Sequence, residues 1–235
     1  MSQPHLIDQI LKDVRLLGED VDIKETPSNS SKVLGSHPES APFDGHFNFR
    51  SVIGKLNYLE KSTRPDIAYA VHQCARFAAN PKKEHGEAVK RIGRYLRGNR
   101  DKGIILKLSD DSFEVWDDSN TARSRSGYYI TYLGCPILWK SQLQTRIALR
   151  TCEAEYITLS QALRKVTPLM GIVQEMKRNG YNVGATTPTV LCTAFVDNTG
   201  ALTLANAPAM RPRTKHINNK YHHFRSFVAR GEVNI

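Results

Sequence analysis

The hydrophobic period of this sequence changes from 3.6 residues to 2 near residue 104, and this change constrains the fold more than any other feature. Before it, apolar residues recur at helical spacing and predict helices over residues 4–17, 49–60, 66–77 and 84–97. After it, alternating β-prone residues predict short strands over residues 104–108, 113–116, 127–133, 136–139 and 146–149. We therefore expect a helical segment followed by a sheet.

The remainder of the sequence adds helices to that sheet. Residues 152–166 predict a helix, and Thr167-Pro168 is typical of the start of a second helix that runs to residue 180. A continuous apolar run over 190–196 predicts a buried strand. Helices over 199–205 and 217–228 and a strand over 232–235 follow. This order predicts a mixed α/β domain.

Composition excludes several classes of protein. Hydrophobic residues make up 40% and charged residues 24% of the 235, which is ordinary for a globular chain and unlike a low-complexity one. No apolar run approaches the roughly 18 to 20 residues of a membrane span, and the N-terminus has no signal-peptide core. The four cysteines form no CxxC pair, so we expect reduced cysteines in an intracellular protein.

The net charge of +10 is unevenly distributed. Residues 1–48 contain eight acids and four bases, whereas residues 49–235 contain 29 bases and 15 acids. Residues 121–150 and 211–230 contain bases but no acid. Such blocks favour a polyanionic partner and indicate nucleic acid. For any single block, a solvated basic face is the alternative interpretation.

Three carboxylates lie at the ends of predicted elements. Asp118 follows the strand at 113–116, Glu153 opens the helix at 152, and Asp197 ends the buried strand. Ligand sites of α/β sheets gather at such positions. Three converging carboxylates suit Mg²⁺ or Mn²⁺, and a pair of these ions about 4 Å apart can cleave a phosphodiester. The alternative is that these acids only cap helices.

Five segments, taken in order, resemble the C-terminal part of Ty1/copia-type retrotransposon polyproteins. The first segment resembles the connection between reverse transcriptase and ribonuclease H, and residues 1–25 resemble the tail of the polymerase. No Tyr-x-Asp-Asp polymerase signature is present. The five segments are FRSVIGKLNYLEKSTRPDIAYAVHQCARF, NPKKEHGEAVKRIGRYLRG, SGYYITYLGCPILWKSQLQTRIALRTCEAEYITLS, FVDNTGALTLA and RPRTKHINNKYHHFR.

The resemblance implies a ribonuclease H-like mixed sheet flanked by helices and preceded by a small helical connection segment. The implied domains are a reverse transcriptase tail and linker (1–48), the connection segment (49–103) and a ribonuclease H-like domain (104–235). Motif positions carry the family's metal-binding acids onto Asp118, Glu153 and Asp197. The implied activity is two-metal hydrolysis of the RNA strand of RNA–DNA hybrids with Mg²⁺ or Mn²⁺, in the cytoplasm, in retroelement particles or in the nucleus.

Basic, tryptophan and histidine residues outside the acidic site also have expected roles. Arg213, Lys215 and Lys220 are candidate contacts for nucleic acid, although a solvated helix is the alternative. Trp116 and Trp139 are expected in the core rather than as base-stacking platforms. His216, His222 and His223 have no Cys or acid at ligand spacing, so we interpret them as surface residues rather than as a zinc site.

The sequence departs from the family pattern in three places. The segment from Asp118 to Gly127 is shorter than the family's, Arg150 stands beside the Glu153 motif, and the chain stops before the family's fourth acid and closing helix. Asp117 is the other claimant for the first acid, but strand alternation places it on the opposite face from Asp118. These departures support an alternative, in which the chain is a catalytically inactive remnant with residual nucleic-acid binding.

Overall fold

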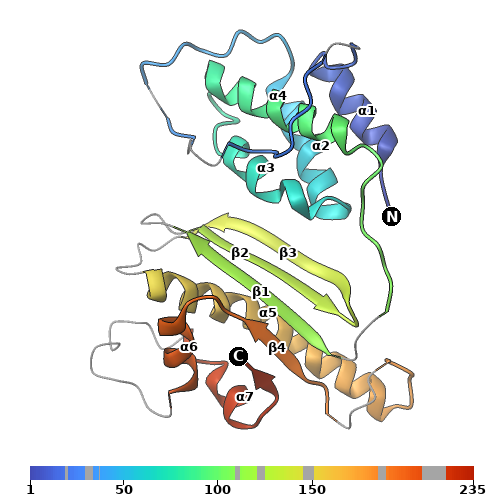
Figure 1. Ribbon diagram of the computed structural model, residues 1–235, viewed down its shortest axis with the longest axis vertical. Coiled ribbons are helices and arrows are strands. Elements are labelled where there is room, and N and C mark those ends of the chain that lie inside the picture. Colours follow the sequence, from blue (N-terminus) through green and yellow to red (C-terminus); the bar gives the residue numbers. More distant parts are fainter. Residues whose placement is uncertain are drawn as a thin grey trace. The chain divides into compact units, whose positions relative to one another are not determined.

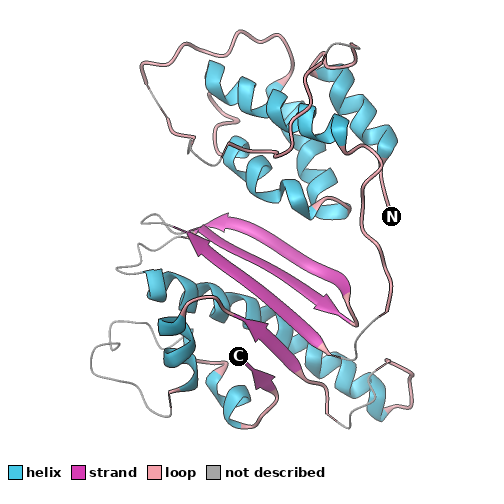
Figure 2. Ribbon diagram, in the orientation of Figure 1, coloured by secondary structure: helices cyan, strands magenta, loops and turns pink. Residues whose placement is uncertain are grey.

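The structure is a computed structural model that divides into two compact units, Met1–Ile105 (unit 1) and Leu106–Ile235 (unit 2) (Figure 1). In the part of the chain that is described, unit 1 contains helices and loops, and all strands belong to unit 2 (Figure 2). This division follows the change of hydrophobic period. The described residues are 1–18, 21–29, 34–36, 38–108, 112–120, 125–144, 151–184, 189–207 and 221–235.

Unit 1 is a helical unit with one apolar core. The side chains of Leu11, Val52, Leu56 and Ile92 are almost fully buried in it, so the N-terminal helix belongs to the same core as the later helices. The predicted helix over 4–17 ends earlier, at Asp13, and Arg15 has a positive φ of 60°. The other three predicted helices of this unit are confirmed. The elements are α1 (Pro4–Asp13), α2 (Phe49–Ser62), the 3₁₀ turn η1 (Pro65–Ile67), α3 (Ala68–Ala75) and α4 (Lys83–Gly98).

An ion pair between the buried Arg64 and the partly exposed Asp66 connects the elements of unit 1. The Arg64 side chain is 2% exposed, and its Nε and Nη2 donate to the Asp66 carboxylate at 2.8 to 3.2 Å. Its Nη1 donates to the carbonyl oxygen of Asn99 at 2.9 Å, and the Tyr95 hydroxyl donates to Asp66 at 2.7 Å. The Arg-Pro-Asp sequence of the TRPD motif therefore ties η1 to the C-terminal end of α4.

The strand predicted over residues 104–108 is wrong. Ile104 exchanges two backbone hydrogen bonds with Met1, at 2.6 and 2.9 Å, but no ladder continues from it. Ile105 and Leu108 are 80% and 70% exposed, so the alternating apolar residues do not pack on a sheet. This segment runs from the last helix of unit 1 into unit 2 (Figure 1).

The described strands of unit 2 form one five-stranded mixed sheet in the order β3-β2-β1-β4-β5. The strands β1, β2 and β3 form an antiparallel meander, whereas β4 is parallel to β1 and β5 is parallel to β4. Leu133 and Gly134 form the turn between β2 and β3 with φ of 53° and 74°, which matches the twist of a tight hairpin. The strands are β1 (Phe113–Asn120), β2 (Arg125–Tyr132), β3 (Cys135–Leu143), β4 (Cys192–Phe195) and β5 (Val233–Asn234).

One long helix, α5 (Thr151–Arg178), crosses the sheet and packs on β1 and β2 (Figure 1). The predicted helix start at Thr167-Pro168 is wrong, because Pro168 lies inside α5. Val166 and Met170, on either side of Pro168, are both buried in the same core, and this packing favours one continuous helix.

Two short helices, α6 (Thr199–Asn206) and α7 (Arg225–Ala229), complete the described part of unit 2. The helix predicted over 217–228 is wrong for residues 221–224, which are not α-helical, and residues 217–220 lie outside the described chain. The strand predicted over 146–149 also lies outside it.

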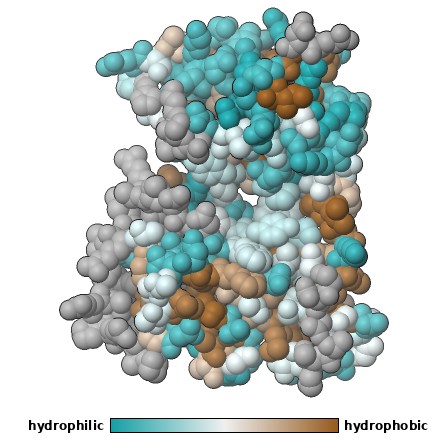
Figure 3. Space-filling model, viewed as in Figure 1, coloured by the Kyte–Doolittle hydropathy of each residue, from teal (hydrophilic) through white to brown (hydrophobic). Residues whose placement is uncertain are grey.

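The surfaces of the two units differ in the view of Figure 3, where unit 1 is mostly hydrophilic and unit 2 shows more hydrophobic side chains. Trp116 is 47% exposed, so the expectation that Trp116 belongs to the core is wrong. Among the described helices, none is both long and apolar enough to cross a membrane.

Candidate active site

The ends of β1 and β4 bring two of the three predicted acids to one edge of the sheet. The last backbone pair between these parallel strands joins Trp116 to Phe195. Asp118 and Asp197 each follow that pair by two residues, Asp118 inside β1 and Asp197 just after β4. Parallel strands end on the same edge, so the two residues are neighbours along it. The side chain of Asp118 lies outside what the structure describes.

The third acid, Glu153, lies in the first turn of α5. The N-terminal ends of α5 and α6 approach each other closely, since a Cβ atom on Gly200 would lie 3.0 Å from Cys152 Sγ. Cys152 precedes Glu153, and Gly200 is three residues after Asp197. The fold therefore brings Glu153 towards the edge that carries Asp197.

A buried polar cluster anchors the start of α5 to the sheet. Gln144 Nε2 lies 2.9 Å from the carbonyl oxygen of Ala154, 3.0 Å from Ser126 Oγ and 3.1 Å from Thr158 Oγ1. Ser126 and Thr158 also share a hydrogen bond of 2.9 Å between their hydroxyl groups. Because Ala154 follows Glu153 directly, this cluster fixes the position of the candidate acid. The sequence analysis did not identify Gln144 as important for the site. Its position at the end of the WKSQLQ segment is the only sign of that role in the sequence.

Asn198 forms the N-cap that begins α6 directly after Asp197. Its Oδ1 accepts hydrogen bonds from the backbone N–H groups of Gly200 and Ala201, at 2.9 and 3.1 Å. This cap ends the strand segment and starts the helix within two residues. The backbone at Asp197 is held between β4 and α6 as a result.

Asp117 is the second sequence-based claimant for the acid on β1. Its neighbours on the same strand face, Phe113 and Val115, are buried against α5 in the core of unit 2. Both carboxylate oxygens of Asp117 are buried. Asp117 therefore lies on the face of the sheet that carries Glu153, and we regard it as a second candidate for the β1 acid.

The predicted acids do not form a complete metal cluster within the side chains that the structure describes. Among those residues, no group of three or more His, Cys, Asp or Glu side chains is arranged to hold a metal ion. The predicted contacts Arg213, Lys215 and Lys220, together with His216, lie in the segment 208–220, outside the described chain.

His222 and His223 have structural partners on α5. His222 Nδ1 lies 2.7 Å from the Tyr156 hydroxyl, and His223 Nδ1 lies 3.5 Å from Ser160 Oγ. Burial raises the pKa of Tyr156 to about 12, so its hydroxyl keeps its proton in this hydrogen bond. The two histidines thus attach residues 221–224 to the same helix that carries Glu153.

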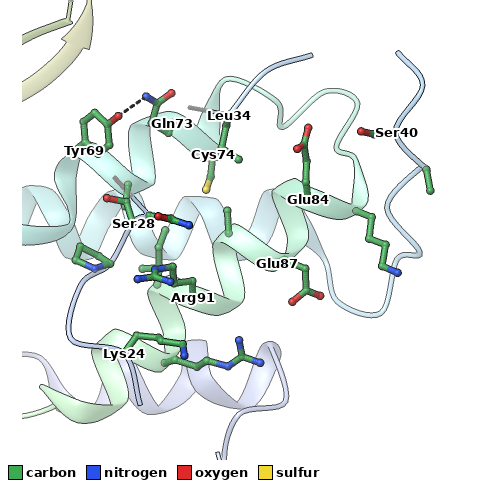
Figure 4. A pocket seen from close by; sticks show the side chains of 18 residues that line it. Lys24, Ser28, Leu34, Ser40, Tyr69, Gln73, Cys74, Glu84, Glu87 and Arg91 are labelled. Atoms are coloured by element: carbon green, nitrogen blue, oxygen red, sulfur yellow. Dashed lines mark hydrogen bonds between the residues drawn. The ribbon is translucent and has the colours of Figure 1, made fainter. Parts of the chain in front are cut away.

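Unit 1 contains a separate cavity of about 580 Å³ between α3, α4 and the segment from Lys24 to Ala41 (Figure 4). Gln73 Nε2 donates to the Tyr69 hydroxyl at its edge, at 3.0 Å. The lining contains bases, such as Lys24 and Arg91, and the acids Glu84 and Glu87. Because both signs of charge line it, the lining as a whole does not identify a ligand class, and the acidic edge of unit 2 is the better candidate for the active site.

The strand order, the antiparallel meander and the helix across it define unit 2 as an α/β domain of the ribonuclease H-like class. Over 188 residues, the chain is 37% identical to the retrovirus-related Pol polyprotein from transposon TNT 1-94 of Nicotiana tabacum, covering 77% of the chain and 13% of that protein. It is 34% identical over 194 residues to the corresponding polyprotein from transposon RE1 of Arabidopsis thaliana, covering 80% and 13%.

The uncharacterized mitochondrial protein AtMg00810 of Arabidopsis thaliana is 30% identical over 175 residues, covering 71% of the chain and 70% of that protein. The chain thus belongs to the family of retrovirus-related Pol polyproteins of plant transposons, and it spans about an eighth of the length of the two polyproteins compared. No protein-family model matches the sequence.

A solved structure of the foamy viral protease-reverse transcriptase in complex with double-stranded DNA aligns with 99% of this chain and 40% of that one. The TM-score is 0.49 and the sequence identity is 14%.

Proposed function

We propose that unit 2 is a retroelement ribonuclease H domain that hydrolyses the RNA strand of RNA–DNA hybrids with two divalent metal ions. The observation that carries the proposal is the backbone register of β1 and β4, which places Asp118 and Asp197 at one sheet edge. The start of α5, with Glu153, is directed to the same edge by the contact between Cys152 and Gly200.

The donor chemistry of this edge fits Mg²⁺ or Mn²⁺, because both ions prefer carboxylate oxygens. Asp197 and Glu153 would hold the ions together with an acid from β1, either Asp118 or Asp117. The bound ions would supply charge stabilisation to the attacking and leaving oxygens. Gln144 and Asn198 keep the backbone on either side of the acids in place.

Nucleic acid is the proposed partner of this site. The chain carries a net charge of +10, and two of its segments are basic without any acid. Counterion release from a nucleic acid makes binding to such a protein strongly dependent on salt. Arg213, Lys215 and Lys220 are the side chains that we propose as hybrid contacts.

The alternative function is an inactive remnant that only binds nucleic acid. It is favoured by Arg150 beside the Glu153 motif, because an arginine next to a carboxylate metal site can compete with a cation. It is also favoured by the short segment between Asp118 and Gly127, because an error of about 1 Å in a catalytic group can cost on the order of 100-fold in rate.

Cleavage of a labelled RNA–DNA hybrid in Mg²⁺ or Mn²⁺ separates the two functions. We expect cleavage by the wild-type chain, and a loss of about 100-fold or more in the Asp197→Asn variant because a metal ligand is removed. Glu175→Gln is the matched control, since this exposed acid lies near the far end of α5 from Glu153. Absence of cleavage in the wild type, with salt-dependent binding retained, would establish the remnant instead.

A further inference from the structure

The cavity of unit 1 carries its acids and its bases at different ends. Glu84 and Glu87 belong to the first two turns of α4, whereas Arg91 and Arg94 follow later in the same helix. At a rise of about 1.5 Å per residue, Glu84 and Arg94 are about 15 Å apart along the helix axis. Lys24 lies at the same end as Arg91 (Figure 4). We call Lys24, Arg91 and Arg94 the basic end of the cavity.

The basic end keeps an excess of positive charge. Glu87 lies 3.6 Å from Lys90 Nζ, so a base that does not line the cavity pairs with this acid. Lys24 Nζ donates to the exposed carboxylate of Asp22, and this hydrogen bond, with the charges of the two arginines, holds the pKa of Asp22 below its usual value. Among the described residues that line the basic end or pair with it, three bases thus stand against one acid.

Two donors at the basic end have no acceptor. The Nε atoms of Arg91 and Arg94 are buried, and neither has a hydrogen-bond partner among the residues that the structure describes. Buried polar groups are nearly always hydrogen-bonded, and an unsatisfied one requires an explanation such as a bound ion. Arg91 is held in place by its Nη2, which donates to Thr26 Oγ1 at 2.9 Å. The two arginines therefore have unused capacity to bind an anion.

Arg91 and Arg94 are also close enough to repel each other. They are three residues apart on one face of α4, where like charges destabilise a helix. An anion between them would remove this repulsion. Other arginines of unit 1 instead donate to oxygen atoms of the protein, as Arg50, Arg64, Arg76, Arg97 and Arg100 do.

The rest of the lining is largely apolar. Tyr69 and Gln73 stand at its edge, where Gln73 Nε2 donates to the Tyr69 hydroxyl (Figure 4). A volume of about 580 Å³ lies within the range of small-molecule sites, which combine apolar walls with a few polar groups. It is many times the share of about 30 Å³ that one water molecule takes in the liquid, so a bare phosphate ion would fill only a part of it. The apolar wall consists of Pro27, Leu34, Ala70, Ala88 and Ile92.

We propose that this cavity binds a nucleotide, with its phosphate at Arg91 and Arg94 and its base along the apolar wall. Arginine is suited to this role because its planar fork of donors matches the oxygens of a phosphate. A nucleotide also joins the phosphate to a flat ring system, which an apolar wall with a tyrosine at its edge can accept. The nucleotide is either free or the terminal nucleotide of a nucleic-acid strand, since both present the same chemistry. The inference goes beyond the proposed cleavage, because it requires neither the acids of unit 2 nor a metal ion.

The test is isothermal titration calorimetry of the full chain with adenosine monophosphate (AMP) in EDTA. We expect saturable binding of one AMP per chain. Adenosine should bind at least about tenfold more weakly, because it lacks the phosphate that the arginines would bind. Inorganic phosphate should also bind at least about tenfold more weakly, because it makes no contact with the apolar wall.

Arg94→Gln is the most informative variant. It removes the charge and the unsatisfied donor, and we expect it to weaken AMP binding at least about tenfold. The variant should fold as stably as the wild type or more so, because Arg94 Nε has no described partner to lose and the repulsion from Arg91 disappears. AMP should therefore raise the thermal midpoint of the wild type but not that of Arg94→Gln.

A second variant tests the cavity without changing its charge. Ala88→Leu adds side-chain volume one turn before Ile92, and it should also weaken AMP binding by about tenfold. Lys61→Gln is the matched control, because it removes one positive charge at an exposed position of α2, a helix that contributes no residue to the lining. It should bind AMP as the wild type does.

Competition identifies the source of the nucleotide. An oligo(dT) with a 5′-phosphate that displaces AMP, while its 5′-hydroxyl counterpart does not, would assign the cavity to the end of a strand. Displacement by neither would assign it to a free nucleotide. Asp197→Asn should bind AMP normally in EDTA, so a failure of the cleavage proposal is distinguishable from a failure of this one.

Three results would overturn the inference. The first is an absence of saturable AMP binding in the wild type. The second is wild-type affinity in Arg94→Gln and in Ala88→Leu, which would place any bound AMP elsewhere. The third is equal affinity for AMP and inorganic phosphate, which would reduce the cavity to a site for a simple anion.

Discussion

Unit 1 and unit 2 use their charged motif residues in different ways. In unit 1 the buried Arg64 donates to Asp66 and to the Asn99 carbonyl, and Nδ1 of the buried His85 accepts from the Lys82 backbone N–H. In unit 2 the acids Asp118, Glu153 and Asp197 lie at the ends of strands or the start of a helix. Family motifs therefore stabilise the fold in one unit and gather around a candidate site in the other.

The largest expected effect is a loss of stability in unit 1 when its buried arginine is removed. Arg64→Ala removes a buried side chain that donates charged hydrogen bonds to Asp66 and to the Asn99 carbonyl, and we expect it to destabilise unit 1 by about 2 to 4 kcal/mol. Hydrogen exchange measured by mass spectrometry should be faster in the variant than in the wild type in α2, α3 and α4. The strands of unit 2 should exchange as they do in the wild type. Lys61→Ala, at an exposed position of α2, is the control. Equal losses of protection in both units would contradict the division.

The next effect concerns the anchor of α5 in unit 2. Gln144→Ala removes the donor to the Ala154 carbonyl, and leaving buried acceptors unsatisfied should cost about 1 to 3 kcal/mol. Urea unfolding followed by tryptophan fluorescence reports on unit 2, because Trp116 and Trp139 both belong to it. Gln142→Ala, which removes one contact to Gln161 at a half-buried site, should cost less. An equal cost for the two variants would argue against a special role of Gln144.

A smaller effect compares one helix cap in each unit. Asn48 caps α2 by accepting from the Ser51 backbone N–H at 3.0 Å, and Asn198 caps α6 in the same manner. Replacing either residue by alanine should cost about 1 kcal/mol. Only Asn198→Ala should also reduce hybrid cleavage, because Asn198 follows Asp197. A similar reduction of cleavage by Asn48→Ala would remove the functional distinction between the units.

The smallest effect is a dependence of unit 1 on pH. Burial acts to raise the pKa of Asp66, but hydrogen bonds donated by Arg64 and Tyr95 outweigh it and hold this pKa below its usual value. A lowered pKa stabilises the folded state above the unfolded value near 4, and the contribution disappears as pH falls through the lowered pKa. Urea unfolding between about pH 5 and pH 2 should show a shallower pH dependence in Asp66→Asn than in the wild type. Identical pH profiles would contradict this assignment.

The helices of unit 1 and the strands of the meander were predictable because their patterns are local. The amphipathic pattern of 84–97 matches α4. The strand predicted over 127–133 overlaps β2 and ends one residue after it. The strand predicted from the alternation over 104–108 was wrong because a strand also needs a partner strand. No local sequence feature shows that Ile104 pairs with Met1 instead of with the sheet. The second helix predicted to start at Thr167-Pro168 was wrong because core packing on both sides of Pro168 keeps α5 continuous.

The candidate site was predictable in part. The element ends and the motifs identified Asp118 and Asp197, which the β1 and β4 register brings to one edge, and Glu153, which the start of α5 brings towards that edge. The roles of Gln144 and Asn198 depend on contacts across the fold, which the sequence pattern does not encode. The exposure of Trp116 depends on which face α5 covers, and this is decided by the packing of the whole domain.

The central claim is that the edge formed by β1, β4 and the start of α5 binds divalent metal ions. A titration of the full chain with Mn²⁺, followed by electron paramagnetic resonance of the free ion, tests it most directly. The account predicts saturable binding in the wild type that is lost or weakened at least about tenfold in Asp197→Asn and is unchanged in Glu175→Gln. Equal binding in all three proteins, or no saturable binding in any, would contradict it.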